Sequence, residues 1–147
     1  MSEITITPLN PSPRVREMLS EILIEVVANG GSVSFMHPLA QAAADAFWDD
    51  SLAAAVRDER IILGAWDGDN LVGTVTLLLK LPPNQPHRAE IAKMMTRLSH
   101  RGRGIASALM REAESRAVAL RRTLLVLDTA EEDGASGLYE RDRKSVV

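Results

Sequence analysis

The hydrophobic residues of this chain change their spacing after Arg57, and that change constrains the fold more than any other feature. From Val15 to Val27 they recur at steps of three and four residues, which predicts an amphipathic helix. A second helical stretch is expected from about Pro38, because proline suits the first turn of a helix, to Arg57. Beyond it, two β-rich runs, Ile61 to Trp66 and Leu71 to Lys80, predict strands. A chain with this order must pack helices against a sheet.

Turn-forming residues separate these elements. Asn29, Gly30 and Gly31 tolerate positive φ and end the first helix. The segment 67–70, Asp-Gly-Asp-Asn, predicts a tight hairpin, so the two β-rich runs should be antiparallel neighbours. The apolar face that we expect on the second helix, with Trp48 beside it, consists of Leu39, Ala42, Ala43, Ala46, Phe47, Ala53, Ala54 and Val56.

Further elements complete the pattern on either side of the hairpin. Strands are expected over Ile4 to Leu9, Arg88 to Thr96 and Thr123 to Thr129, with a helix from about Gly104 to Leu120 before the last of them. Residues Gly134 to Arg141 could form a short terminal helix. The order predicts an α/β (α+β) fold, in which a mixed, mostly antiparallel central sheet is flanked by helices.

Composition narrows the classes of protein to consider. The chain of 147 residues is expected to be a single domain, 1–147, since 46% apolar and 25% charged residues is the balance of a folded globular protein. A net charge of −3 argues against nucleic acid as the main partner. The chain lacks cysteine, which excludes thiol nucleophiles and thiolate zinc sites, and its three histidines are too scattered to propose as metal ligands. No apolar run is long enough to span a membrane and no signal peptide is visible, so we expect a cytoplasmic protein.

The most informative stretch is Arg101-Gly102-Arg103-Gly104-Ile105-Ala106, between a predicted strand and a predicted helix. Glycines allow a close approach to the main chain, a helix N-terminus attracts anions, and arginines add charge-assisted hydrogen bonds. The loop therefore predicts a cradle for phosphate or diphosphate, and the alternative is a basic loop that only caps the helix. The Walker loop and the three-glycine dinucleotide fingerprint are both absent.

Residues 101–106 fit the Gln/Arg-x-x-Gly-x-Gly/Ala signature of the GNAT-type acetyl-CoA-dependent N-acetyltransferases, and they lie where that family places it. The segments 82–90, 93–95 and 124–129 also resemble this family, in particular a subgroup that includes the tabtoxin resistance protein. The resemblance is close over about 61–141 and loose before that. It implies the GNAT fold and acetyl transfer from acetyl-CoA, as co-substrate and without a metal, to a small-molecule amine. A role in resistance or detoxification would follow from the subgroup.

The resemblance also implies which residues bind acetyl-CoA. The backbone amides of Gly102, Arg103, Gly104, Ile105 and Ala106, with the Arg101 and Arg103 side chains, would bind the diphosphate. The main chain of Met94, Met95 and Thr96 would pair with the pantetheine arm like an added strand and supply the amide that faces the thioester oxygen. The Met94 and Met95 side chains could at the same time be core residues, because these contacts use main-chain atoms.

Catalytic roles follow from the same resemblance. Tyr139 lies where these enzymes commonly place a tyrosine near the sulfur of CoA, and its phenol could protonate the thiolate, although it could instead be a buried aromatic residue. Glu90 and Asp128 are the candidate bases for the amine, and the sequence does not choose between them. Trp48 and His87 are candidate substrate contacts, and core packing is the alternative for Trp48. For Phe47 we expect core packing, and for His87 an ordering role in the loop remains open.

The chain departs from the family pattern after Arg141. The family normally continues with Leu-Gly-Phe and two further strands, whereas here 142–147 read Asp-Arg-Lys-Ser-Val-Val. We therefore expect a GNAT fold that lacks the last strands, with an open edge on the fifth strand that could support a homodimer. This departure keeps a second hypothesis open, a weakly active or non-catalytic CoA-binding module. The acceptor is not identified by the sequence.

Overall fold

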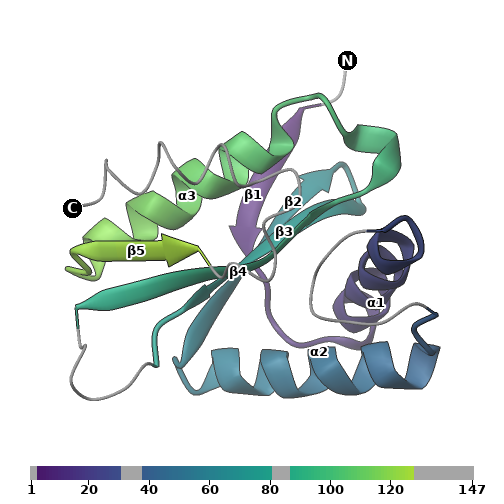
Figure 1. The fold of residues 1–147 in the computed structure, drawn as a ribbon, viewed down its shortest axis with the longest axis horizontal. Coiled ribbons are helices and arrows are strands. Elements are labelled where there is room, and N and C mark those ends of the chain that lie inside the picture. Colours follow the sequence, from purple (N-terminus) through teal and green to yellow (C-terminus); the bar gives the residue numbers. More distant parts are fainter. Residues whose placement is uncertain (1–2, 31–37, 81–86, 128–147) are drawn as a thin grey trace.

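A computed structural model describes residues 3–30, 38–80 and 87–127 of the chain. In these ranges helices and strands follow one another in the predicted order (Figure 1). The elements are β1 (Ile4–Pro8), α1 (Pro13–Ala28), α2 (Gln41–Val56), β2 (Arg60–Asp67), β3 (Asn70–Leu78), β4 (Arg88–Thr96), the short 3-10 helix η1 (Leu98–His100), α3 (Ile105–Ala119) and β5 (Leu124–Leu127).

The five strands form one sheet in the order β1-β2-β3-β4-β5. The first three pairings are antiparallel, and β5 runs parallel to β4. Parallel neighbours need a long crossover connection, and η1 and α3 supply it. The prediction of a mixed, mostly antiparallel sheet with flanking helices is confirmed.

Helices cover both faces of the sheet (Figure 1). One apolar cluster joins α3 to the sheet and is centred on Leu109, Met110 and Ile91. A second cluster joins α1 and α2 to the other face and contains Leu19, Leu23 and Trp48. The core is therefore split between two faces, and each helix contributes one apolar stripe.

Local sequence signals explain where α1 and the hairpin begin and end. The Ser12 hydroxyl accepts a hydrogen bond from the Val15 amide at 3.0 Å, and Pro13 occupies the first turn, where it loses no helical bond. Gly30 follows the helix at a φ of +84°. In the hairpin turn Gly68 has a φ of +62°.

The prediction for α2 needs two corrections. The helix begins at Gln41, after an Ala40 N-cap that makes no side-chain hydrogen bond, and not at Pro38. The predicted apolar face is largely exposed. Within α2, Ala54 of that face is buried, and the other buried side chains are Ala44, Trp48, Ser51 and Leu52. Alanine is tolerated on either side of a helix, so the larger Trp48 and Leu52 decide which side faces the sheet.

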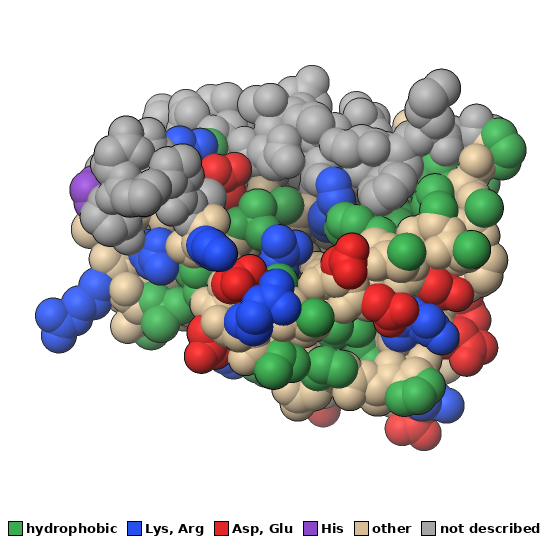
Figure 2. Space-filling model, turned by 90° about the horizontal axis from the view of Figure 1, so that it is seen from below, with side chains coloured by type: hydrophobic (Ala, Val, Ile, Leu, Met, Phe, Trp, Pro, Cys, Tyr) green, Lys and Arg blue, Asp and Glu red, His purple; other side chains and the backbone are tan. Residues whose placement is uncertain are grey.

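The outward side of α2 carries acidic and basic side chains mixed with small hydrophobic ones (Figure 2). Val56 is 64% exposed on this helix. Among the described residues, no helix has the length and apolar character to cross a membrane. Within the same ranges, the acidic and histidine side chains form no cluster of three that could hold a metal ion.

Candidate functional site

The arginine- and glycine-rich loop lies where β4 gives way to α3. After Thr96 the chain makes η1, turns through Arg101 to Gly104, and enters α3 at Ile105. Gly102 and Gly104 have φ values of +79° and +78°, which is the left-handed region that favours glycine. Neither has a described atom within 4 Å of the place where a side chain would begin, so backbone conformation and not packing requires the glycines. The main chain of the loop is thus open to a ligand.

The electrostatic character of this loop is positive. Gly104 is the N-cap of α3 and supplies no side-chain acceptor, and the first turn of the helix has no acidic residue. The free amide groups and the helix dipole therefore face outward without a compensating charge from that turn. Arg101 and Arg103 are both exposed, and Arg101 Nε also donates to the Thr96 carbonyl at 3.4 Å. The arrangement suits an anion with several oxygens.

Strand β4 is distorted immediately before the loop. Opposite β3, Thr74 pairs with Met95 and Thr76 pairs with Ala92, so β4 has one more residue than β3 in this interval. That is a β-bulge, and Lys93 within it has a left-handed φ of +52°. A lysine in this conformation is uncommon and marks a locally strained backbone. Its ammonium lies 5.5 Å from the centre of the Phe47 ring on α2.

The described pairing of β4 with β5 covers only the first part of β4, before the bulge. The parallel pairing joins Arg88 through Ile91 to Leu124 through Leu127. From Ala92 to Thr96, β4 has no pairing with β5 within the described part of the chain. The main chain of Met94 to Thr96, which the resemblance assigned to the pantetheine arm, lies beyond these pairs, and Met95 and Thr96 pair with β3 on the other side. The Met94 and Thr96 side chains are partly buried. The Met95 side chain is 2% exposed, which fits the expectation that Met95 is also a core residue.

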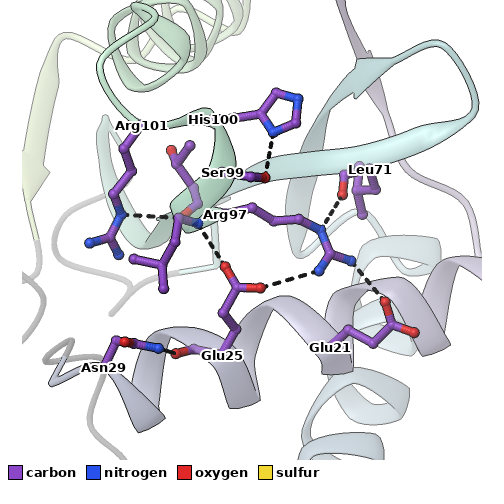
Figure 3. Close-up of polar contacts among 10 residues, drawn as sticks. Glu21, Glu25, Asn29, Leu71, Arg97, Ser99, His100 and Arg101 are labelled. Atoms are coloured by element: carbon purple, nitrogen blue, oxygen red, sulfur yellow. Dashed lines mark hydrogen bonds and ion pairs between the residues drawn. The ribbon is translucent and has the colours of Figure 1, made fainter.

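The turn that leads into the loop is tied to α1 (Figure 3). Glu25 accepts a hydrogen bond from the Leu98 amide at 2.7 Å and one from Arg97 Nη1 at 3.4 Å. Arg97 Nη2 reaches Glu21 at 2.9 Å, and Arg97 Nε donates to the Leu71 carbonyl on β3 at 3.0 Å. One arginine thus joins the turn to α1 and to the sheet.

A second contact holds the same turn to the β2–β3 hairpin. His100 Nε2 lies 2.9 Å from Asp67 Oδ2, and its Nδ1 lies 2.7 Å from the Ser99 hydroxyl. Sequence reasoning assigned no role in the site to Glu21, Glu25, Asp67 or Arg97. No local pattern could have identified them, because the partners are separated by 33 to 76 residues and meet only in the folded chain.

The remaining predicted site residues are placed differently. Glu90 lies on β4, is 21% exposed and forms an ion pair with Arg88 at 3.1 Å. His87 is exposed, and its carbonyl accepts the Thr123 amide at 2.9 Å, which joins the start of β4 to the start of β5. Asp128, Tyr139 and the short helix expected at 134–141 lie outside the described residues.

Trp48 is a correction to the sequence analysis. Its side chain is 0% exposed in the cluster between α1, α2 and the sheet, so it presents no surface to a substrate. Phe47, for which we expected core packing, is the more exposed of the two and packs edge-to-face on Trp48 with ring centres 4.8 Å apart. The spacing along the helix explains why Trp48 and not Phe47 is buried: Trp48 lies four residues from both Ala44 and Leu52, on the same buried side.

A groove of about 750 Å³ opens between the start of α1 and the end of α2. Apolar residues such as Pro11, Leu52 and Val56 line it together with Arg16 and Asp49. None of its lining residues belongs to the site predicted from the sequence. It is therefore separate from the arginine- and glycine-rich loop.

Comparison with known proteins identifies the family. Residues 26–143 match the acetyltransferase (GNAT) family. The chain belongs to that family. The match contains the bulged strand, the loop and α3, so the family resemblance inferred from residues 101–106 is confirmed.

Solved structures share the fold of this GNAT chain at low sequence identity. An N-acetyltransferase from Staphylococcus aureus Mu50 superposes with a TM-score of 0.73 at 21% identity, over 95% of this chain and 81% of that one. PaiA N-acetyltransferase from Thermoplasma acidophilum, solved with coenzyme A, gives 0.72 at 17% identity, over 95% and 88%. Ribosomal-protein-alanine N-acetyltransferase from Brucella melitensis gives 0.72 at 18% identity, over 92% and 81%. These similarities establish the GNAT fold, whereas the narrower subgroup and the shortened C-terminus stay predictions.

Proposed function

We propose that this GNAT chain transfers an acetyl group from acetyl-CoA to the primary amine of a small molecule. The observation that carries the proposal is the loop 101–104, where two left-handed glycines and two exposed arginines precede a helix with no acid in its first turn. Such a loop presents main-chain donors and positive charge to a diphosphate. The open space over Gly102 and Gly104 fits a ligand that approaches the backbone closely.

The donor would use two neighbouring parts of the structure. The amides of Gly102 to Ala106, with Arg101 and Arg103, would bind the diphosphate. The pantetheine arm would lie along β4 from Met94 to Thr96, on the side away from β3, where main-chain groups can bond to it as to an added strand. The bulge at Lys93 supports this, because it interrupts the regular pairing of β4 with β3 just before that stretch and so redirects the main-chain groups that follow.

The chemistry requires one group to accept a proton and another to donate one. The amine nitrogen would attack the thioester carbonyl carbon, the carbon–sulfur bond would break, and CoA would leave as the thiolate. Glu90 or Asp128 would take the proton from the amine, and Tyr139 would protonate the sulfur. Glu90 is the one of these whose place is described, on the strand that also carries Met94 to Thr96. His87, exposed at the start of β4, is a proposed substrate contact.

Release of CoA thiol with a panel of amines tests the proposal. Wild-type protein should release thiol with at least one primary amine and bind CoA in calorimetry. Arg103→Glu should abolish CoA binding, since it places a negative charge beside the diphosphate. Arg14→Glu makes the same charge change at an exposed position of α1 and should bind CoA like wild type.

Three outcomes are informative. Thiol release that depends on an amine supports the proposal, and the best amine defines the acceptor class and tests the resistance role. CoA binding without thiol release for any amine would favour the non-catalytic CoA-binding alternative. No heat on titration of CoA into folded wild-type protein would contradict both.

A further inference from the structure

We infer that Glu25 is a positioning residue for acetyl-CoA: it holds the turn before the loop 101–104 in the conformation that binds the diphosphate. The inference rests on the proposed function and adds a residue of α1 that lies far from the loop in sequence. Its basis is the pair of hydrogen bonds that the Glu25 carboxylate accepts from the turn, one from the Leu98 amide at 2.7 Å and one from Arg97 Nη1 at 3.4 Å (Figure 3).

The bonding around Leu98 connects Glu25 directly to the loop. The Leu98 amide donates to Glu25, and the Leu98 carbonyl accepts from the Arg101 amide at 3.4 Å. The main chain of Leu98 is therefore bonded to α1 through its amide and to the first residue of the loop through its carbonyl. A shift of the turn would move Arg101 and the glycines after it.

The carboxylate of Glu25 is well suited to hold a turn in place. It is 28% exposed, and Arg97, its ion-pair partner, is 21% exposed, so water competes with this contact less than on an open surface. The end of α1 that carries it is itself fixed, because Asn29 Nδ2 donates to the Glu25 carbonyl at 2.8 Å. Arg97 is also bound to Glu21 and to the Leu71 carbonyl, so its guanidinium is occupied by contacts within the protein and is not directed to the ligand.

A matched set of variants isolates the bond between Glu25 and Leu98. Glu25→Ala removes the acceptor, and Glu25→Gln keeps an acceptor oxygen without the charge. Leu98→Pro removes the donor from the other side. Proline fits here because Leu98 opens η1, its side chain is 41% exposed, and Arg97 has a ψ of 144°, which suits a residue before proline. Glu17→Ala, at an exposed position of the same helix, is the control.

The readouts are the dissociation constant of CoA by calorimetry and steady-state kinetics with acetyl-CoA. Glu25→Ala and Leu98→Pro should each weaken CoA binding about five- to tenfold, which is less than a hydrogen bond to a charged group contributes in full, because only part of its loss reaches the ligand through the turn. Glu25→Gln should lie between Glu25→Ala and wild type, and Glu17→Ala should equal wild type. The KM for acetyl-CoA should rise while kcat at saturation is unchanged, which a general loss of stability would not produce.

The double variant Glu25→Ala/Leu98→Pro completes the cycle. Its dissociation constant for CoA should be no higher than that of the single variant with the higher value, because both changes remove the same bond. Additive losses, or variants that melt earlier but bind CoA like wild type, would overturn the inference while leaving the proposed function intact. If Glu25→Ala does not fold, Glu25→Gln and Leu98→Pro carry the test. Absence of CoA binding by wild type would overturn both.

Discussion

At the scale of single residues, two glycines with similar backbone angles have different expected roles. Gly30 and Gly104 have φ values of +84° and +78°, and neither has a described atom close to where a methyl group would lie. A side chain in the left-handed region costs about 1 to 2 kcal/mol, so Gly30→Ala and Gly104→Ala should lower the free energy of unfolding by similar amounts. Only Gly104→Ala should weaken CoA binding, because relaxation of its backbone would tilt the first amides of α3. Urea unfolding and calorimetry on both variants measure this.

A second prediction at this scale concerns Asp45 on α2. A hydrogen bond from Ser20 at 2.6 Å, with further help from Gln41 and Arg16, holds the pKa of the Asp45 carboxyl below its usual value, although burial opposes this. A carboxyl with a lower pKa in the folded state adds stability above its unfolded pKa, and that contribution is lost as the pH falls through the folded pKa.

Wild-type protein should therefore lose stability more steeply than Asp45→Asn as the pH falls below about 4, near the ordinary pKa of aspartate. Unfolding by urea at a series of acidic pH values measures the two slopes. Asp69→Asn, the same change in the hairpin turn, controls for the loss of one carboxylate. Equal slopes for wild type and Asp45→Asn would show that the Ser20 contact does not link α1 to α2 in this way.

At the scale of elements, the close approach of α3 to the sheet depends on Gly73 of β3. A methyl group there would lie 3.0 Å from Ile105 Cγ2, 3.2 Å from the Met95 carbonyl and 3.3 Å from Leu109 Cδ1. Gly73→Ala should therefore lower the free energy of unfolding by about 1 to 3 kcal/mol through overpacking.

The same crowding makes a second variant informative. In Gly73→Ala/Ile105→Ala the space vacated on α3 receives the new methyl group, so the loss should be smaller than the sum of the two single losses. Chemical denaturation of the three variants gives the comparison. Additive losses would mean that Ile105 is not the neighbour that limits the approach.

At the scale of the whole molecule, ligand binding should raise the stability of the fold. The proposed donor site joins β4, the loop and α3, which belong to one sheet and its covering helix. Acetyl-CoA at 100 times its dissociation constant should add about 2.7 kcal/mol to the stability of the folded chain. The Tm should therefore rise with acetyl-CoA concentration in wild type and stay constant in Arg103→Glu. A constant Tm for wild type at millimolar ligand would contradict the donor site.

Much of this fold was predictable where strong local signals coincide. β4 was expected and found at Arg88–Thr96, and the hairpin turn and the start of α3 follow from glycine and aspartate at positions that need positive φ or a turn. The glycine-rich loop was predictable for the same reason. The buried side of α2 was not, because alanine carries little information about burial, and Trp48 was therefore assigned to a substrate instead of to the core.

The sequence by itself determined the order of the elements, the family and the loop at 101–106, because periodicity, turn residues and a short signature act over a few neighbouring positions. Only the tertiary structure decided how that loop is held. The contacts of Arg97 with Glu21 and Glu25 join positions more than 70 residues apart, and the bulge at Lys93 exists only in relation to β3. Such contacts have no local pattern, since they depend on which faces meet when α1 and β4 pack on the same sheet.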